Sequence, residues 1–281
     1  MPLVTNHDRQ NGLPEKLAVK LYRAKPDISE LDERFIEIFS KCHAISHPQI
    51  ARHFGLTMYK GFIAIVREYI EGIRLSQLLD QAEPLSIAEA KRIILQIIGL
   101  LEELDRYDVR NKRLVPDNFI LRDTGSVTLI NLGLSSYLKD VKHACVRQFK
   151  LVSLKWEYWP PSDEFSERSY VYICGLIFNE LLRGRSLRPA DLETFDLTPY
   201  LGGNRPPLPK LVGSAAEFNL LIKVATSRNP QERFSSLDML RKAITGEIDA
   251  QSYSPSLVQK AGDTLRRYRS KLMAELAGSK Q

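Results

Sequence analysis

The chain has 281 residues, of which 43% are hydrophobic and 26% are charged, and its formal net charge is +6. This composition is ordinary for a globular protein, and the length suits one two-lobed domain or two small domains. The modest positive charge allows a nucleic-acid or acidic-membrane partner but does not require one.

Cysteine usage and hydropathy exclude several classes of protein. Cys42, Cys145 and Cys174 are far apart and odd in number, which excludes a disulfide framework and a cysteine-based metal site. The first ten residues hold no signal-peptide core, and no apolar run reaches the roughly 18 residues that a membrane-spanning helix needs. The sequence therefore predicts a cytoplasmic protein without a transmembrane segment.

Sequence periodicity predicts five elements up to residue 107. Apolar residues that alternate or run together indicate strands, and apolar residues that recur every three or four positions indicate helices. The predicted strands are Leu3–Asn6, Lys16–Tyr22 and Gly61–Ile70, and the predicted helices are Ile28–Ser46 and Pro84–Tyr107. Ser86 is the expected N-cap of the second helix.

A predicted hairpin follows these elements and organises the centre of the chain. The apolar runs Asn118–Leu121 and Val127–Ile130 flank Arg122–Ser126, which has the Asp and Gly of a tight turn. Such a hairpin would bring Asn118 and Asn131 to the same end of the sheet.

The polar loops at this end resemble the catalytic and metal-binding loops of the eukaryotic-type (Hanks-type) Ser/Thr protein kinases. Asn118 ends a PDN tripeptide, and Asn131-Leu132-Gly133 stands where the family has DFG. Lys20 takes the place of the phosphate-binding lysine. Further matches are SHPQI at 46–50, the strand and hinge at 61–75 whose backbone would face an adenine, YWPPS at 158–162, ERSYVYICG at 167–175 and Arg233.

The resemblance runs from about residue 14 to about residue 246 and implies an α+β, bilobal kinase-like fold. The implied divisions are a truncated N-terminal β lobe at 1–72, a mainly helical C-terminal lobe at 73–246 and a basic amphipathic helix at 247–281. Only 19 residues precede Lys20, with Gly12 as their single glycine, so the family's glycine-rich loop is expected to be missing.

Five positions depart from the polar residues that the family uses. They are Ile38 for the lysine's Glu partner, Arg113 for the catalytic Asp, Asn131 for the metal-binding Asp, Ser162 for the Glu of APE and Tyr170 for a core Asp. A guanidinium has no acceptor for a substrate proton, and an amide is a weaker magnesium ligand than a carboxylate.

The resemblance and these departures together predict a catalytically inactive kinase-like domain, a pseudokinase, that acts as a scaffold or allosteric regulator. No catalytic residue is assigned. Lys20 and Asn118 are vestigial cofactor-binding positions, and we expect weak or no ATP binding without magnesium, with no metal site. Arg113 could hold an anion in the old site.

Protein partners are expected to use aromatic or basic side chains. Trp156, Tyr158 and Trp159 could pack with Tyr170 into a permanent docking surface, although they could equally be core residues. Arg266 and Arg267 lie on the predicted C-terminal helix, which is expected to pack on the large lobe with a solvated polar face. The alternative is that this helix docks on a partner or an acidic surface.

Two other functions stay open on the sequence. A divergent ATP-dependent phosphotransferase, or another nucleotide-dependent transferase, would need Asp108, Asp117 or Asp123 as metal ligands. A nucleic-acid or membrane-surface binder would rely on the basic tail, but the chain has no basic patch interleaved with aromatic residues, so nucleic acid is not favoured.

Overall fold

The structure is a computed structural model that describes residues 3–5, 13–23, 33–60, 62–81, 83–112, 114–134, 158–161, 165–187 and 207–253. The chain divides into two compact units, Met1–Trp159 with Leu176–Leu208, and Pro160–Gly175 with Pro209–Gln281. Helix α5, Glu167–Arg183, contributes residues to both units.

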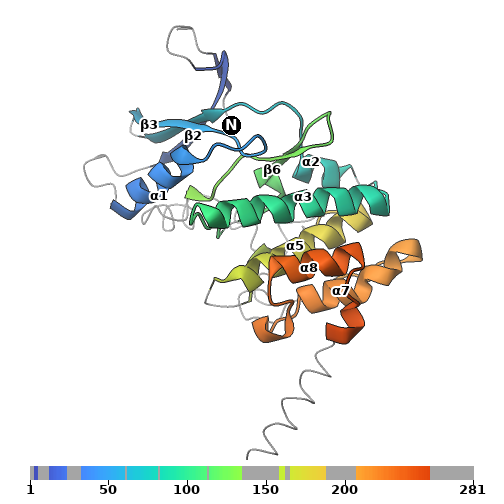
Figure 1. The fold of residues 1–281 in the computed structure, drawn as a ribbon. Helices are drawn as coiled ribbons and strands as arrows, with labels where there is room; N and C mark the ends of the chain where they lie inside the picture. Colours follow the sequence, from blue (N-terminus) through green and yellow to red (C-terminus); the bar gives the residue numbers. More distant parts are fainter. Residues whose placement is uncertain are drawn as a thin grey trace, which may run out of the picture. The chain divides into compact units, whose positions relative to one another are not determined.

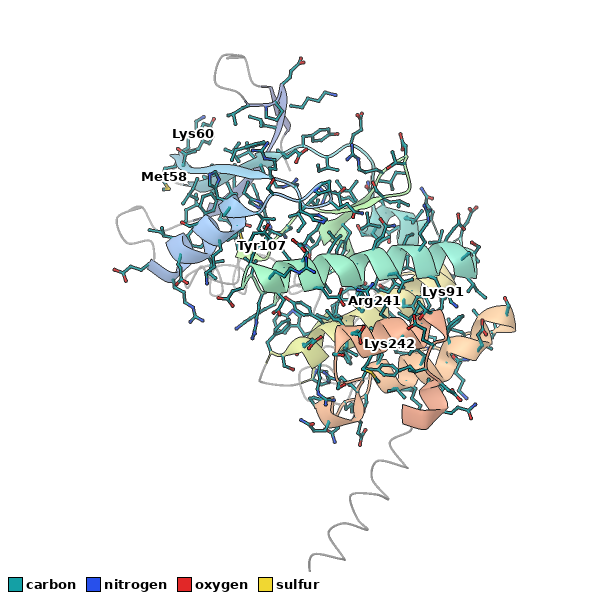
Figure 2. All side chains as sticks on the ribbon, viewed as in Figure 1. Met58, Lys60, Lys91, Tyr107, Arg241 and Lys242 are labelled. Carbon is teal, nitrogen blue, oxygen red and sulfur yellow. The ribbon has the colours of Figure 1, made fainter. Side chains whose placement is uncertain are left out.

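The first unit contains an antiparallel sheet with the strand order β1-β2-β4-β3 (Figure 1). The predicted strand pair at the N-terminus is confirmed, because β2 pairs with β1 over its first residues. Lys60, in the turn between β3 and β4 (Figure 2), has a φ of 48°. The strands are β1 Leu3–Thr5, β2 Lys16–Arg23, β3 His53–Tyr59 and β4 Phe62–Glu68.

Cross-strand register decides which side chains share a face of this sheet. Lys20 of β2 lies opposite Ile65 of β4, and Ala18 lies opposite Arg67. His53 of β3 pairs with Arg67 from the other side. Directly opposed residues, and residues two apart on a strand, point to the same face. Lys20, Arg67 and His53 therefore share one face.

Helix α1, Glu33–Ala44, packs beside β3 in the same unit (Figure 1). It buries Phe35, Ile38 and Cys42 on one face, which is the helical spacing predicted from the sequence. The predicted helix began at Ile28, and residues 24–32 lie outside the described part of the chain.

Helix α3, Ile87–Arg106, confirms the long amphipathic helix, and its cap is the expected one. The Glu89 amide donates to Ser86 Oγ at 3.2 Å, and the Ser86 amide donates to Glu89 Oε2 at 3.1 Å. This reciprocal pair satisfies two backbone donors that a helix start leaves open. The buried face consists of apolar residues from Ala90 to Leu104.

A second sheet, in the order β5-β6-β7, contains the predicted hairpin. β6, Phe119–Leu121, pairs antiparallel with β7, Val127–Leu129. The Gly125 amide closes the turn on the Arg122 carbonyl at 2.8 Å. On the other side of β6 lies β5, Ile73–Arg74, which leads into α2, Leu75–Asp80.

The free side of β7 is covered by the segment that follows α1. The Ala51 amide donates to the Leu129 carbonyl at 2.9 Å, and the Leu129 amide donates to the Gln49 carbonyl at 2.8 Å. The Gln49 side chain also donates to Gln96 Oε1 at 2.8 Å and to the Val127 carbonyl at 3.1 Å. These bonds join the segment, the hairpin and α3.

The second unit is helical in its described part. Its core includes Leu221, Ile222, Phe234 and Leu240, all buried. Arg241 and Lys242 lie on α8 (Figure 2). Besides α5, the elements are η7 Gly213–Phe218, α7 Asn219–Ala225, η8 Pro230–Glu232, α8 Leu237–Thr245 and η9 Ala250–Tyr253.

Small antiparallel sheets together with a larger set of helices give the α+β class that the sequence predicted. None of the helices in the described ranges is long and apolar enough to cross a membrane.

Candidate functional site

The hairpin brings Asn118 and Asn131 to one end, as predicted. Asn118 closes the 3₁₀ turn η3, Pro116–Asn118, and the Ile130 amide donates to its carbonyl at 2.8 Å. The side chain of Asn118 is buried, and its Oδ1 accepts from the Val115 amide at 2.9 Å. This amide therefore holds the loop before β6 in place.

Residues 131–133 are fixed by Asn111, which lies two residues before Arg113. Asn111 Nδ2 donates to the Asn131 carbonyl at 2.8 Å, and the Gly133 amide donates to Asn131 Oδ1 at 3.4 Å. Gly133 has a φ of +75°, and a Cβ there would collide with the Asn111 side chain. Arg113 itself lies outside the described residues.

Glu37 of α1 does not form the ion pair with Lys20 that the family's lysine and glutamate would form. Lys20 Nζ lies 5.0 Å from the centroid of the Tyr22 ring. Ile38, at the position predicted for the glutamate, is buried, whereas Glu37 is on the exposed side of α1 and pairs with Lys41 at 3.0 Å.

The three aspartates of the transferase alternative lie at separate places. Asp108 binds Lys41 at 2.6 Å, and this hydrogen bond lowers the pKa of the aspartate and raises the pKa of the lysine. Asp117 accepts from Ser76 Oγ, and Asp123 lies in the exposed turn at the other end of the hairpin from Asn131. Within the described ranges, no three His, Cys, Asp or Glu side chains form a group that could hold a metal ion.

Arg67 is a residue that sequence reasoning missed. It is only 5% exposed at the end of β4, and its Nη1 donates to the Glu68 carbonyl at 2.9 Å. Burial lowers the pKa of Arg67 to about 10, with the nearby Arg74 charge as a second cause. The available signal was a cation directly after the apolar run FIAIV, in the stretch FIAIVREYI.

His53, beside Arg67, is a second buried group that the sequence analysis did not select. It is 4% exposed, and its Nδ1–H donates to the Ala51 carbonyl at 3.1 Å. Burial lowers the pKa of His53 to about 4, and the charge of Arg67 adds to the effect. The histidine is therefore neutral at pH 7, and its hydrogen bond holds the Ala51 carbonyl in place.

The predicted aromatic docking residues have different environments. Tyr158 is 2% exposed and its hydroxyl donates to buried Glu180 at 2.5 Å, whereas Trp159 is 36% exposed. Glu180 also accepts from the Leu187 amide at 2.6 Å. Trp159 is thus the exposed member of this pair, and Trp156 lies outside the described residues, as do Ser162, Arg266 and Arg267.

In the second unit, Tyr170 and Arg233 are both buried. Tyr170 meets Phe165 edge-on, with ring centroids 5.0 Å apart. Arg233 donates to the carbonyls of Ser227, Arg168 and Arg228 at 2.7, 3.1 and 3.2 Å. Its guanidinium also lies over the Tyr172 ring, at 4.8 Å from the centroid.

A family model matches the part of the chain that carries the motifs described above. These motifs are, in order, Lys20, the PDN turn, residues 131–133, Tyr158 and Arg233. The model of the protein kinase domain matches residues 6–244. The chain belongs to the protein kinase domain family. The Hanks-type kinase fold implied by the sequence motifs is thereby confirmed.

Similar kinases come from bacteria and fungi. The chain is 22% identical over 245 residues to "Serine/threonine-protein kinase PrkC" of Bacillus subtilis, covering 85% of this chain and 37% of that protein. It is 28% identical over 239 residues to "Carbon catabolite-derepressing protein kinase" of Saccharomyces cerevisiae, covering 81% and 35%. For "Serine/threonine-protein kinase PknL" of Mycobacterium tuberculosis (H37Rv), the identity is 26% over 176 residues, covering 61% and 43%. The chain spans less than half the length of each of these relatives.

Proposed function

We propose that this member of the kinase family does not transfer phosphate and acts as a protein-interaction scaffold or allosteric regulator. The observation that carries the proposal is the neutral amide of Asn131 at the position of the family's metal-binding carboxylate, with its Oδ1 accepting from the Gly133 amide. In kinase sites magnesium is held by the carboxylate at this position together with a catalytic-loop asparagine and phosphate oxygens, and much of phosphoryl-transfer catalysis is electrostatic.

Two further substitutions support the proposal. Arg113 stands at the position of the general base, and a permanently protonated guanidinium has no lone pair for a substrate proton. Ile38 contributes an apolar side chain where the family's glutamate would orient Lys20, and the adjacent Glu37 is engaged with Lys41. Recovery of activity would therefore require replacement ligands at several positions at once.

The competing function is a divergent nucleotide-dependent transferase, and the kinase names of the relatives favour it. It would need carboxylates near Asn131 and Lys20. Asp108 and Asp117 are engaged with Lys41 and Ser76, and Asp123 lies at the opposite end of the hairpin. This arrangement makes the transferase the weaker proposal.

A thermal-shift titration with ATP, alone and with Mg²⁺ or Mn²⁺, separates the two functions. We expect no metal-dependent stabilisation, because the anionic ligand is replaced by Asn131. Ligand binding stabilises a protein by RT ln(1 + [L]/Kd), so a site that is 99% occupied would add about 3 kcal/mol. A metal-dependent rise of several degrees would favour the transferase and overturn the scaffold proposal.

A further inference from the structure

Arg67, the penultimate residue of β4, stands just before the β4–β5 connection, where the kinase resemblance implies backbone that would face a nucleotide base. Glu68 is the last residue of β4, and its amide already donates to the Arg52 carbonyl at 2.8 Å. Its carbonyl accepts from Arg67 Nη1 at 2.9 Å. Both backbone groups of this last residue of β4 are therefore engaged within the protein.

The register of the sheet gives Arg67 a defined position. It lies between Ala18 of β2 and His53 of β3, on the face that also carries Lys20. Ala18 opposes it with only a methyl side chain, and the arginine is 5% exposed. The guanidinium is therefore buried, and it donates to the carbonyl of the next residue of its own strand.

The apolar residues of the neighbouring elements pack against each other in the same region. Ile70 of the β4–β5 connection forms one buried cluster with Ala51 and with Ile120 and Ile130 of the hairpin. The connection is thus held to the hairpin by apolar contacts, while the Glu68 carbonyl is held by Arg67.

We propose that Arg67 occupies the base-binding position of this kinase-family chain and prevents a purine from pairing with the Glu68 carbonyl. The inference rests on the proposed loss of phosphate transfer. It names Arg67 as the residue that would prevent the base of a nucleotide from binding. The exocyclic amine of adenine is a donor and needs an acceptor at this connection. A carbonyl oxygen has a second lone pair, so the block is steric as well as polar: the buried guanidinium fills the space beside the oxygen.

The test uses adenosine as the probe, because it lacks phosphates and needs no metal. We expect Arg67→Met to bind adenosine at least about tenfold more tightly than the wild type, measured by calorimetry and by amide shifts of Glu68–Gly72. Methionine is flexible and about as long as the arginine side chain up to Nε, so it can fill the apolar part of the arginine site without donating a hydrogen bond. Arg67→Gln, which is too short to reproduce the same bond, is the second variant if the methionine variant does not fold.

Arg74→Met is the matched control. The charge of Arg74 adds to burial in lowering the pKa of Arg67, whereas the donor to the Glu68 carbonyl is Arg67 itself. Removing the Arg74 charge therefore leaves the block in place. We expect this variant to bind adenosine as weakly as the wild type. An equal gain in Arg74→Met would show that charge, not occupation of the site, excludes the base.

The outcomes separate this inference from the proposed function. Folded Arg67→Met and Arg67→Gln proteins that bind adenosine no better than the wild type would overturn the role of Arg67, while the scaffold proposal would stand. Metal-dependent ATP binding and phosphorylated product from the wild type would overturn the scaffold proposal. If the wild type bound adenosine as tightly as Arg67→Met, the inference that Arg67 blocks the base would be refuted, and the scaffold proposal would be unaffected.

Discussion

Tyr158 and Trp159 are adjacent in the sequence but have opposite environments. The Tyr158 hydroxyl is buried against Glu180, so Tyr158→Phe removes a donor from a buried carboxylate. We expect this change to lower the free energy of unfolding by roughly 1–3 kcal/mol. Urea denaturation monitored by circular dichroism measures the loss.

Trp159→Phe provides the control for that experiment, because Trp159 is 36% exposed. A surface substitution of this kind is expected to change stability by no more than about 0.5 kcal/mol. Equal losses in the two variants would contradict the assignment of Tyr158 to the core and of Trp159 to the surface.

His53 makes stability depend on pH. Its folded pKa of about 4 lies below the ordinary value of 6.5, so between these values the unfolded chain binds the extra proton and the folded state loses stability as pH falls. The difference amounts to about 2 kcal/mol at pH 5 relative to pH 7.5. We expect His53→Gln to lose this part of the pH dependence in urea titrations at the two pH values.

The surroundings of His53 define the control for the pH experiment. Arg67, Lys20 and His43 all disfavour its protonation, and only the Ala51 carbonyl favours it. His43→Gln replaces an exposed histidine next to the same site, and it should keep most of the pH 5 to pH 7.5 difference. If His43→Gln flattened the curve as much as His53→Gln, the buried histidine would not be the source.

At the scale of elements, the sequence predicted those with strong local signals and missed the strand β3, His53–Tyr59. The capped helix α3 and the hairpin β6–β7 were correctly predicted, because a repeated apolar face and a DTGS turn are local signals. The two-residue strand β5 could not be predicted, since its pairing depends on β6, which lies more than 40 residues later. The burial of Arg67 was missed for the same reason: Ala18, one of its cross-strand neighbours, comes from β2, which is distant in the sequence.

Gly72 allows β5 to approach β6. It has a φ of +139°, and a Cβ there would lie 2.5 Å from the Leu121 carbonyl oxygen and 2.7 Å from Ile120 Cγ2. We expect Gly72→Ala to destabilise the protein by about 2 kcal/mol or more, because strain and a backbone clash act together. Thermal or urea unfolding measures the effect.

Gly99 of α3 is the matched control for Gly72. Nothing lies within 4 Å of a Cβ built at Gly99, and the residue is inside a helix. Gly99→Ala should therefore stabilise the protein by roughly 0.5–1 kcal/mol. A loss of stability in this variant would mean that the volume around α3 is filled, contrary to the structure.

At the scale of the whole molecule, the chain keeps the kinase fold while its catalytic positions diverge. Order and spacing of degenerate motifs were enough to predict the family, because the fold depends on apolar periodicity and turns that persist after polar catalytic residues are lost. Which aromatic side chains are exposed could not be predicted in the same way, since the exposure of a residue such as Trp159 depends on tertiary packing.

Restoring one catalytic residue should not restore the reaction. Arg113→Asp returns a carboxylate to the position of the general base, but Asn131 and Ile38 are unchanged. Residues that act together in catalysis are strongly non-additive, so we expect no phosphorylated product from Arg113→Asp with ATP and Mg²⁺ in a radiolabel assay. Product from this single variant would require the scaffold proposal to be abandoned.

The cover over β7 limits how a partner can bind to the hairpin. Many recognition domains capture a peptide by adding it as a new strand to an open sheet edge. In this protein the Leu129 amide and carbonyl are already bonded to Gln49 and Ala51. A partner at this edge would have to displace that segment or contact side chains alone. The same occupied edge also disfavours strand-to-strand self-association through β7.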